Sequence, residues 1–410
     1  MPGNPREVWV TGIGLVSSLG EGIEAHAALL SPAARPAPIL NESAYAPYSV
    51  HPLAPLDLSK QIPKKSDQRQ MEGWQRIGVY AAGLALADAG IAGNAELLDR
   101  TGLVVAAGSG ERDTAVDCTV LEKLDGREDT GVLAKEVLPS ALRPTLFLAQ
   151  LSNLLAGNIS VVHNVTGSSR TFMGEEMAGL AAAENAVRRI AAGQGDLFLV
   201  GGSLNAERED LLLGYELGHN LWRGPFRPVW ERHEAGGGFV PGSVGAFLVL
   251  EARGHAEARG ARPYAKVTGV VSDRCNRTHG EAAELGLRLF ATLCSGLSDG
   301  PLPVLSGASG VAPVTQQELD FLRALDSGGF DPIIRAYGSL VGHGVEAHLA
   351  TGMALAALTI SRQNFLPPLD DSGVERPFEG DPGRVLVTSF GHWRGEGLAL
   401  IEAVAEGGTR

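Results

Sequence analysis

One turn in the sequence has the surroundings of a nucleophile but lacks an obvious one. Residues 159–162 read Ile-Ser-Val-Val, a β-branched run typical of a short strand, and a long helical stretch follows at residues 174–192. A sharp turn between a strand and a helix exposes a side chain, and the helix N-terminus stabilises negative charge on it. The expected tip, residues 164–167, reads Asn-Val-Thr-Gly. Val165 therefore stands where a reactive group is expected.

Hydroxyl groups beside this turn offer another nucleophile. Thr166, Ser168 and Ser169 are close in sequence. A serine or threonine needs a general base within hydrogen-bond reach, and His163 and His343 are the candidate bases. Whether any of these hydroxyls acts stays open at this stage.

Two other motifs resemble binding sites only in part. His343, Glu346 and His348 have the spacing H-x-x-E-x-H, which differs from the zinc motifs H-E-x-x-H and H-x-x-E-H, and histidines five residues apart diverge on a helix. Gly12 and Gly14 follow a strand, but the third glycine of a dinucleotide site comes too late. We therefore expect neither a metal nor a cofactor.

A basic segment contrasts with the acidic chain. Its side chains are Lys60, Lys64, Lys65, Arg69 and Arg76. Such a segment is commonly a solvated surface. Lys64, Lys65 and Arg69 are also candidates for docking an acidic partner.

Composition restricts the class of protein. The 410 residues favour two domains or two fused halves, and 44% hydrophobic with 20% charged residues is ordinary for a globular protein. The net charge of −13 argues against nucleic acid as a partner. Three cysteines without a C-x-x-C pair favour a reducing cytoplasm. We find no signal sequence and no run of 18 apolar residues, so no membrane insertion is expected.

Short apolar runs alternate with Ala-rich helical runs, which indicates an α/β fold. Strands are expected at residues 8–11, 102–106, 197–200, 246–251, 265–271 and 385–387. Helices are expected at residues 73–89, 144–155, 174–192, 281–297, 315–325 and 343–359.

A weak internal repeat suggests two similar halves. The motif Val-Thr-Gly at residues 10–12 recurs at residues 267–269, and the segment at residues 195–202 is similar to that at residues 383–391. Both pairs keep the same order. We therefore divide the chain into residues 1–254 and residues 255–410.

Several segments together resemble the β-ketoacyl-acyl-carrier-protein synthases, the condensing enzymes of fatty-acid and polyketide assembly. They are V-W-V-T-G-I-G-L-V-S-S-L-G (8–20), A-A-G-Q-G-D-L-F-L-V-G-G (191–202), R-P-V-W-E-R-H-E-A-G-G-G-F-V-P-G-S-V-G-A-F-L-V-L-E (227–251), G-S-L-V-G-H (338–343) and S-F-G (389–391). The resemblance implies a thiolase-like fold: two pseudo-repeated α/β halves in a five-layer αβαβα sandwich, normally dimeric.

The family's chemistry requires a cysteine at a helix N-terminus, two histidines, a lysine and a gating phenylalanine. Anchored on residues 158–160, the cysteine position falls on Val165. The first histidine position falls on Ala308, the lysine position on Gly338, and the second histidine is kept as His343.

The gate of the pocket is expected at the last motif. There Phe390 is kept, and the gating phenylalanine itself becomes His392. The spacer after Val165 is longer than in the family, so residues 166–184 are expected to hold an insertion. Within it, Arg170 is a candidate ion-pair partner of Glu175 and Glu176, and a structural and a functional role are both open.

Three functions are compatible with these losses. The first is a non-catalytic subunit that shapes the acyl pocket for chains on acyl carrier protein. It would pair with a cysteine-bearing ketosynthase, as chain-length factors do, or form a homodimer. Among such proteins, the chain most resembles the ketosynthase-like subunits of bacterial very-long-chain acyl gene clusters. The second is an enzyme of altered chemistry, either a malonyl-carrier-protein decarboxylase or a condensing enzyme with another nucleophile. The third is an acyl-carrier or lipid binding protein.

Overall fold

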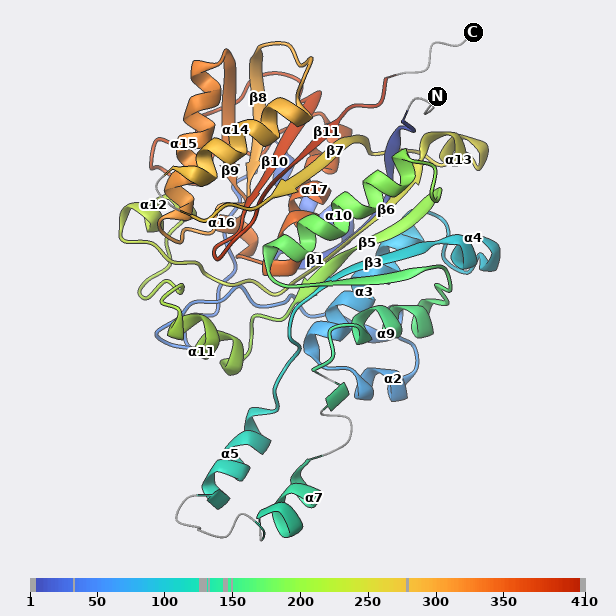
Figure 1. Ribbon diagram of the computed structural model, residues 1–410, viewed down its shortest axis with the longest axis vertical. Coiled ribbons are helices and arrows are strands. Elements are labelled where there is room, and N and C mark those ends of the chain that lie inside the picture. Colours follow the sequence, from blue (N-terminus) through green and yellow to red (C-terminus); the bar gives the residue numbers. More distant parts are fainter. Residues whose placement is uncertain are drawn as a thin grey trace.

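The computed structural model describes residues 5–31, 34–124, 131, 133–142, 147–148, 150–277 and 280–405. Within them, eleven strands form one twisted mixed sheet in the order β4-β3-β5-β6-β1-β7-β11-β10-β8-β9, and β2 pairs with β1 at its side (Figure 1). The strands are β1 (Val8–Ser17), β2 (Gly20–Glu21), β3 (Gly102–Ala107), β4 (Ser169–Met173), β5 (Leu197–Leu204), β6 (Val244–Ala252), β7 (Ala265–Asp273), β8 (Gly300–Ser306), β9 (Phe330–Ala336), β10 (Arg384–Phe390) and β11 (Glu396–Glu402).

The sheet consists of two five-stranded halves with the same topology. In the first half, β4, β3 and β5 are parallel, and β6 and then β1 follow antiparallel. In the second half, β9, β8 and β10 are parallel, and β11 and then β7 follow antiparallel. The halves meet where Val8, Trp9 and Val10 of β1 pair with β7. This confirms the repeat predicted from the sequence, while the boundary at residues 254 and 255 stays a prediction.

Helices cover both outer faces and fill the space between the two halves. They are α1 (Gly22–Ala27), α2 (Lys65–Gln70), α3 (Gly73–Asp88), α4 (Ala95–Arg100), α5 (Thr114–Leu124), α7 (Leu138–Ala141), α9 (Leu154–His163), α10 (Glu176–Ala191), α11 (Glu209–Leu217), α12 (Val229–Glu234), α13 (Arg253–Ala258), α14 (Glu281–Leu293), α15 (Val314–Ser327), α16 (Gly338–Val341) and α17 (His348–Arg362), with short helices η1 (Ala28–Leu30), η2 (Leu58–Lys60), η3 (Leu133–Val137) and η4 (Val345–Ala347). Helix α3 packs on the first half-sheet and α14 on the second, and α10 and α17 contact strands of both. This is the expected order of five layers.

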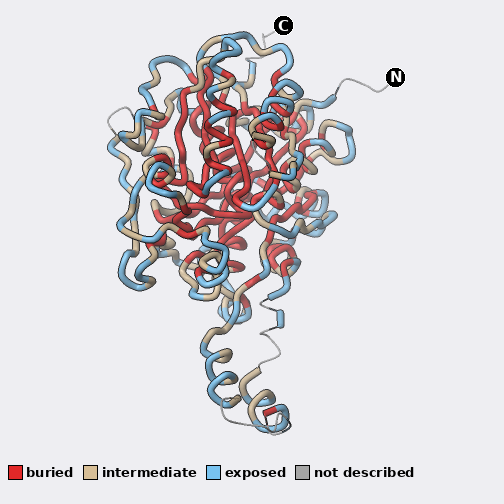
Figure 2. Tube along the Cα trace, turned by 60° about the vertical axis from the view of Figure 1, so that its left-hand side comes forward, coloured by how far each residue is buried: buried red, intermediate tan, exposed pale blue. Residues whose placement is uncertain are grey.

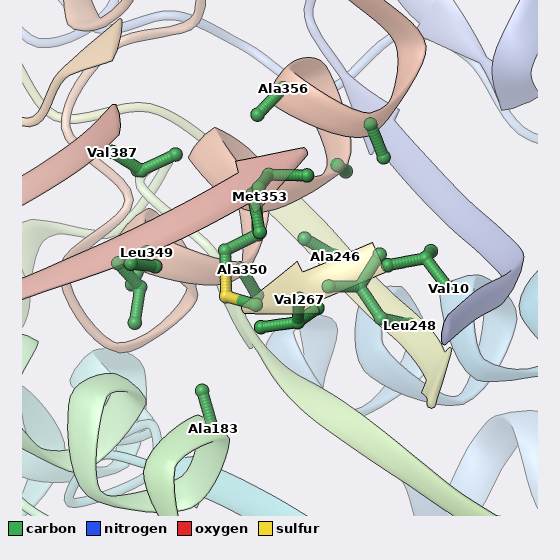
Figure 3. Close-up of a cluster of buried hydrophobic side chains, with 14 of the residues drawn as sticks. Val10, Ala183, Ala246, Leu248, Val267, Leu349, Ala350, Met353, Ala356 and Val387 are labelled. Atoms are coloured by element: carbon green, nitrogen blue, oxygen red, sulfur yellow. The ribbon is translucent and has the colours of Figure 1, made fainter. Parts of the chain in front are cut away.

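The core lies between the middle helices and the strands. Figure 3 shows Ala183 of α10, Leu349, Ala350, Met353 and Ala356 of α17, and strand residues including Val10 and Val267 around one apolar cluster. Small alanine side chains let the helices approach the sheets closely, and strands β1, β3, β5 and β6 are buried along their whole length. Such two-faced burial explains why these strands were recognisable as continuous apolar runs.

One segment projects from this body. Helices α5 and α7 extend away from the layers (Figure 1), and most of their residues are exposed or half-buried (Figure 2). Among the described residues, no helix combines the length and apolar character that crossing a bilayer requires.

Six of the seven predicted strands are present, and the expected helices near residues 73, 174, 281, 315 and 343 correspond to α3, α10, α14, α15 and α17. The helix expected at residues 144–155 lies partly outside the described residues. The strand expected at residues 159–162 is wrong, because these residues belong to α9. Within residues 166–184, where we expected an insertion, lie the regular strand β4 and the start of α10, and the insertion itself stays a prediction.

Candidate functional site

The strand-to-helix turn lies at Glu175, about ten residues after the expected place. Strand β4 ends at Met173, Gly174 adopts a positive φ of +141°, and α10 begins at Glu176. The positive φ favours glycine at this turn. The Glu176 side chain is only 1% exposed, so the helix N-terminus presents a buried carboxylate.

Val165 has a different place. It lies in the connection between α9 and β4 and is buried in the apolar cluster beneath α3 and α9. Asn164 ends α9 in the left-handed conformation, and the Thr166 hydroxyl donates to Asp99 Oδ1 at 2.8 Å. The prediction that Val165 occupies a helix N-terminus is therefore wrong, and its side chain serves packing.

Two histidines converge on one oxygen of Glu176. His343 Nε2 lies 2.6 Å and His392 Nδ1 lies 2.8 Å from Glu176 Oε1, and the His392 backbone N–H donates to the same atom at 3.1 Å. An ionised carboxylate only accepts hydrogen bonds, so both ring nitrogens carry hydrogen in this arrangement. Glu176 pairs with these histidines rather than with Arg170.

Backbone contacts fix both histidines. His343 follows α16, and its N–H donates to the Val240 carbonyl at 2.8 Å, while its own carbonyl accepts from Gly242 N–H at 3.1 Å. His392 follows β10 in a tight loop that the Gly391 N–H closes on the Gly395 carbonyl at 2.9 Å. Segments far apart in the sequence therefore meet at the start of α10.

The cluster is an ion pair held away from water. Burial alone would raise the pKa of Glu176, but the charge of His392 and the hydrogen bonds from both histidines hold that pKa well below its usual value. Burial opposes protonation of His392, yet the negative charge of Glu176 raises the pKa of His392. Burial lowers the pKa of His343. Glu176 is thus the anion and His392 its main counter-charge.

Aromatic side chains and a third histidine enclose the cluster. Tyr215 and Phe239 contact the His392 ring at centroid distances of 5.2 and 5.5 Å. The His348 ring lies 4.2 Å from that of His343 and stacks on Tyr337 at 4.5 Å. On a helix the two histidines of H-x-x-E-x-H would diverge, but His343 precedes the helix, so the rings of His343 and His348 pack together.

Glu346, from the same motif, is also buried here. Burial raises the pKa of Glu346 to about 8, so this carboxyl is mostly protonated at neutral pH. It therefore adds little negative charge beside Glu176.

Ala308 and Gly338 lie together on the inner side of this cluster. A Cβ atom at Gly338 would lie 3.7 Å from the Ala308 carbonyl oxygen and 3.7 Å from His348 Cε1. Both residues are buried, and neither side chain can donate a hydrogen bond. The structure thus brings Ala308, Gly338 and His343 into one region, as the sequence predicted, and adds His348.

A pocket of about 640 Å³ opens over the outer side of the cluster. Its lining includes Glu175, Tyr215 and His392, together with Arg112 and Arg208. Glu175 Oε1 lies 3.7 Å from His392 Nε2. His392 therefore lies between the pocket and Glu176, whereas Phe390, which we expected at the gate, is buried and stacks on Phe321.

The basic candidates for docking lie elsewhere on the surface. Lys64, Lys65 and Arg69 are exposed on and beside α2. Their role stays a prediction.

The family model for the β-ketoacyl synthase N-terminal domain matches residues 6–256, more than half of the chain. The chain belongs to the β-ketoacyl synthase family.

Full-length relatives agree with this assignment. The chain is 26% identical over 447 residues to 3-oxoacyl-[acyl-carrier-protein] synthase 2 of Rhizobium meliloti (strain 1021), covering 98% of this chain and 97% of that protein. It is 26% identical to the tetracenomycin polyketide synthase ketoacyl synthase beta subunit of Streptomyces glaucescens, covering 91% and 90%. The ishigamide ketosynthase/chain length factor structure has a TM-score of 0.79 at 22% identity, covering 98% and 100%, which shows a shared fold.

Sequence reasoning missed Glu176 in this ketosynthase homologue. Acidic residues are favoured in the first turn of a helix, so Glu175 and Glu176 read as an ordinary start of α10. The usable signal was Gly174 directly before them. The β-branched residues of α9 predict a strand instead, and this places the expected turn too early in the sequence.

Proposed function

We propose that this ketosynthase homologue is a non-catalytic subunit that pairs with a cysteine-bearing ketosynthase. It would shape the acyl pocket during fatty-acid or polyketide-type elongation on acyl carrier protein. The observation that carries the proposal is the position of Glu176, at the N-terminus of a buried helix and in contact with His343. That is where the family's cysteine belongs, so the cysteine position falls on Glu176 and not on Val165.

A carboxylate cannot replace the thiolate in this chemistry. Glu176 Oε1 already accepts from three donors, and acyl transfer to a carboxylate would give a mixed anhydride rather than a thioester. The free thiols, Cys118, Cys275 and Cys294, lie outside the residues that form the site. Thr166 is bonded to Asp99 in the α9–β4 connection, and Ser168 and Ser169 lie near it, so none of these hydroxyls faces His343 as a nucleophile would.

The site also lacks part of the set of hydrogen-bond donors that would stabilise an enolate. Enolate formation from a malonyl thioester requires donors aimed at the developing charge. Ala308 and Gly338 supply none through their side chains, and the bond to Glu176 occupies His343 Nε2. This weighs against the alternative function of a malonyl decarboxylase.

The named relatives support a role beside an active partner. One is a ketoacyl synthase beta subunit, one solved structure is a ketosynthase/chain length factor, and another is an acyl-carrier protein in complex with its ketosynthase. We extend these roles to this chain as part of the proposal. A cytoplasmic location belongs to it too, and the unpaired cysteines support it.

The test combines assembly with chemistry. The chain is co-expressed with cysteine-bearing ketosynthases of its source organism, and complexes are sized by chromatography with light scattering. We expect a one-to-one heterodimer. The chain alone is then incubated with malonyl- and acyl-carrier protein, and intact mass and released carbon dioxide are recorded.

Neither an acyl adduct nor carbon dioxide release is expected from the chain alone. A stable adduct, or carbon dioxide release within ten-fold of an active ketosynthase, would contradict the proposal. Glu176→Cys restores a thiol at the helix N-terminus, whereas Val165→Cys places one in the apolar cluster and is the matched control. We expect Glu176→Cys alone to accept an acyl group slowly, and neither variant to condense.

A further inference from the structure

We propose that Glu176, His343 and His392 form a binding site for one divalent transition-metal ion, and that zinc fits it best. Each of the three buried residues offers one ligand atom, and these atoms all lie within 4.8 Å of one another. The sequence could not indicate this set, because Glu176 is separated from His343 by 167 residues and from His392 by 216.

The types of ligand match zinc chemistry. Two imidazole nitrogens and one carboxylate oxygen, with a fourth position left open, form a recurrent zinc site. Tetrahedral bonds of about 2.0–2.1 Å place the ligand atoms roughly 3.3 Å apart. The separations of 2.6 and 2.8 Å from Glu176 Oε1 to the two nitrogens must therefore widen by about 0.7 and 0.5 Å. The ion would displace the ring hydrogens that His343 and His392 now share with Glu176. The hydrogen of neutral His343 would move to its Nδ1, and protonated His392 would release one proton to solvent.

Two unused atoms make this adjustment possible. Glu176 Oε2 and His343 Nδ1 are buried and have no hydrogen-bond partner among the described residues. Because neither atom makes a hydrogen bond, a small rotation of either side chain breaks none at these atoms. A buried polar atom without a partner is also costly, so a new contact with the ion would be favourable. Glu176 Oε2 would also be free to approach the ion as a second carboxylate contact.

The surroundings supply a second layer and an entrance. Glu175 Oε1 lies 3.7 Å from His392 Nε2, so a carboxylate faces the nitrogen of His392 that would not bind the ion, as is common around zinc-bound histidines. The pocket lined by Glu175 and His392 reaches the outer edge of the cluster, so an ion from solvent would enter past the His392 ring. The ion would join α10 to the loops after α16 and β10.

Metal content and affinity test the inference directly. The full chain is purified without an affinity tag that binds metals, stripped with a chelator, and titrated with zinc against a chromophoric competitor. We expect one ion per chain, a rise in melting temperature at one equivalent, and visible absorption bands of tetrahedral cobalt when Co²⁺ replaces Zn²⁺. Glu176→Gln and His392→Phe should each weaken binding at least 100-fold.

The control variant is His219→Asn, which removes an exposed histidine in the left-handed region that asparagine tolerates. Its zinc affinity should equal that of the natural chain. Less than 0.1 equivalent of bound zinc in the natural chain, or unchanged affinity in the Glu176→Gln, His392→Phe double variant, would overturn the inference. The outcome is independent of the proposed function. A chain that pairs with no ketosynthase can still bind zinc, and a chain that binds no zinc can still pair with a ketosynthase.

Discussion

At the scale of single residues, Glu176 and His392 depend on each other. A buried carboxylate needs compensation by charge and hydrogen bonds, and His392 supplies both through its ring and its backbone N–H. Under the proposed function, the family's thiol and gating phenylalanine would occupy the positions of Glu176 and His392, and neither group needs such a partner. We infer that the two substitutions are linked, since either alone would leave a buried charge or a polar ring unmatched.

A double-mutant cycle measures this dependence. His392→Phe should destabilise the fold by about 3 kcal/mol, because it leaves the Glu176 carboxylate without its counter-charge. Adding Glu176→Gln should recover more than half of that loss. Unfolding in urea with a chelator present, so that no metal contributes, gives the four free energies. Effects that simply add would show that the residues are independent.

Glu318 provides a pH-dependent prediction. This carboxyl is buried, donors from Ser306 and Thr388 surround it, and burial raises its pKa to about 7. Its contribution to stability is therefore fully present below pH 4.5, is lost as the pH rises through about 7, and amounts to about 3 kcal/mol. Glu318→Gln should unfold at higher urea concentration than the natural chain at pH 8, and the difference should shrink towards pH 5. Asp320→Asn, an exposed change on the same helix, should show no such trend.

At the scale of elements, a glycine lets α10 approach the segment that carries Glu346. A Cβ atom at Gly179 would lie 2.6 Å from the Glu346 carbonyl oxygen, which is backbone and cannot move easily. Gly179→Ala should therefore push α10 away from η4, destabilise the fold by about 1–3 kcal/mol, and disturb the bond between Glu176 and His343.

Gly214→Ala is the matched control for that change. Gly214 lies within α11, and a Cβ atom there meets nothing within 4 Å. Alanine should stabilise this helix by about 0.5–1 kcal/mol. Thermal and urea unfolding of both variants check the pair, and equal effects of the same sign would contradict the argument from close packing.

The errors in predicting elements have two physical sources. The run at residues 159–162 is β-branched, yet Leu155, Ala156 and Ile159 are buried at helical spacing while Val161 is 71% exposed. Packing of α9 against α3 thus overrides local β propensity. Strand β4 escaped prediction for the opposite reason, since at the sheet edge its residues are exposed or half-buried and show no apolar run.

The candidate site was predictable where motifs reach it. His343, Ala308, Gly338 and His392 all follow from the family's motifs, and the structure gathers them near α10. Glu176 does not follow from these motifs, because no motif ties it to the histidines. Its contact with His343 and His392 arises only where separate segments of the chain meet in the fold.

At the scale of the whole molecule, the two half-sheets are alike, but edge strand β4 is exposed or half-buried whereas much of edge strand β9 is buried. Strand β9 ends one side of the sheet and β4 the other. Strand β4 leads directly into Glu175 and Glu176, and Met173 at its end is 72% exposed. An open strand edge pairs readily with another chain. We therefore expect the ketosynthase proposed as partner to pair along β4, beside the site.

The ladder between β3 and β4 makes this prediction specific. Leu103 N–H donates to the Ser168 carbonyl at 2.8 Å, and Val105 is aligned with Thr171. Because hydrogen bonds alternate along a strand, the Thr171 N–H faces away from β3. Thr171→Pro removes only this outward donor, so the chain should stay folded by circular dichroism but lose at least ten-fold in affinity for its partner. Thr171→Val keeps the donor and should bind normally. Equal affinity of the two variants, measured by light scattering across a concentration series, would place the partner on another surface.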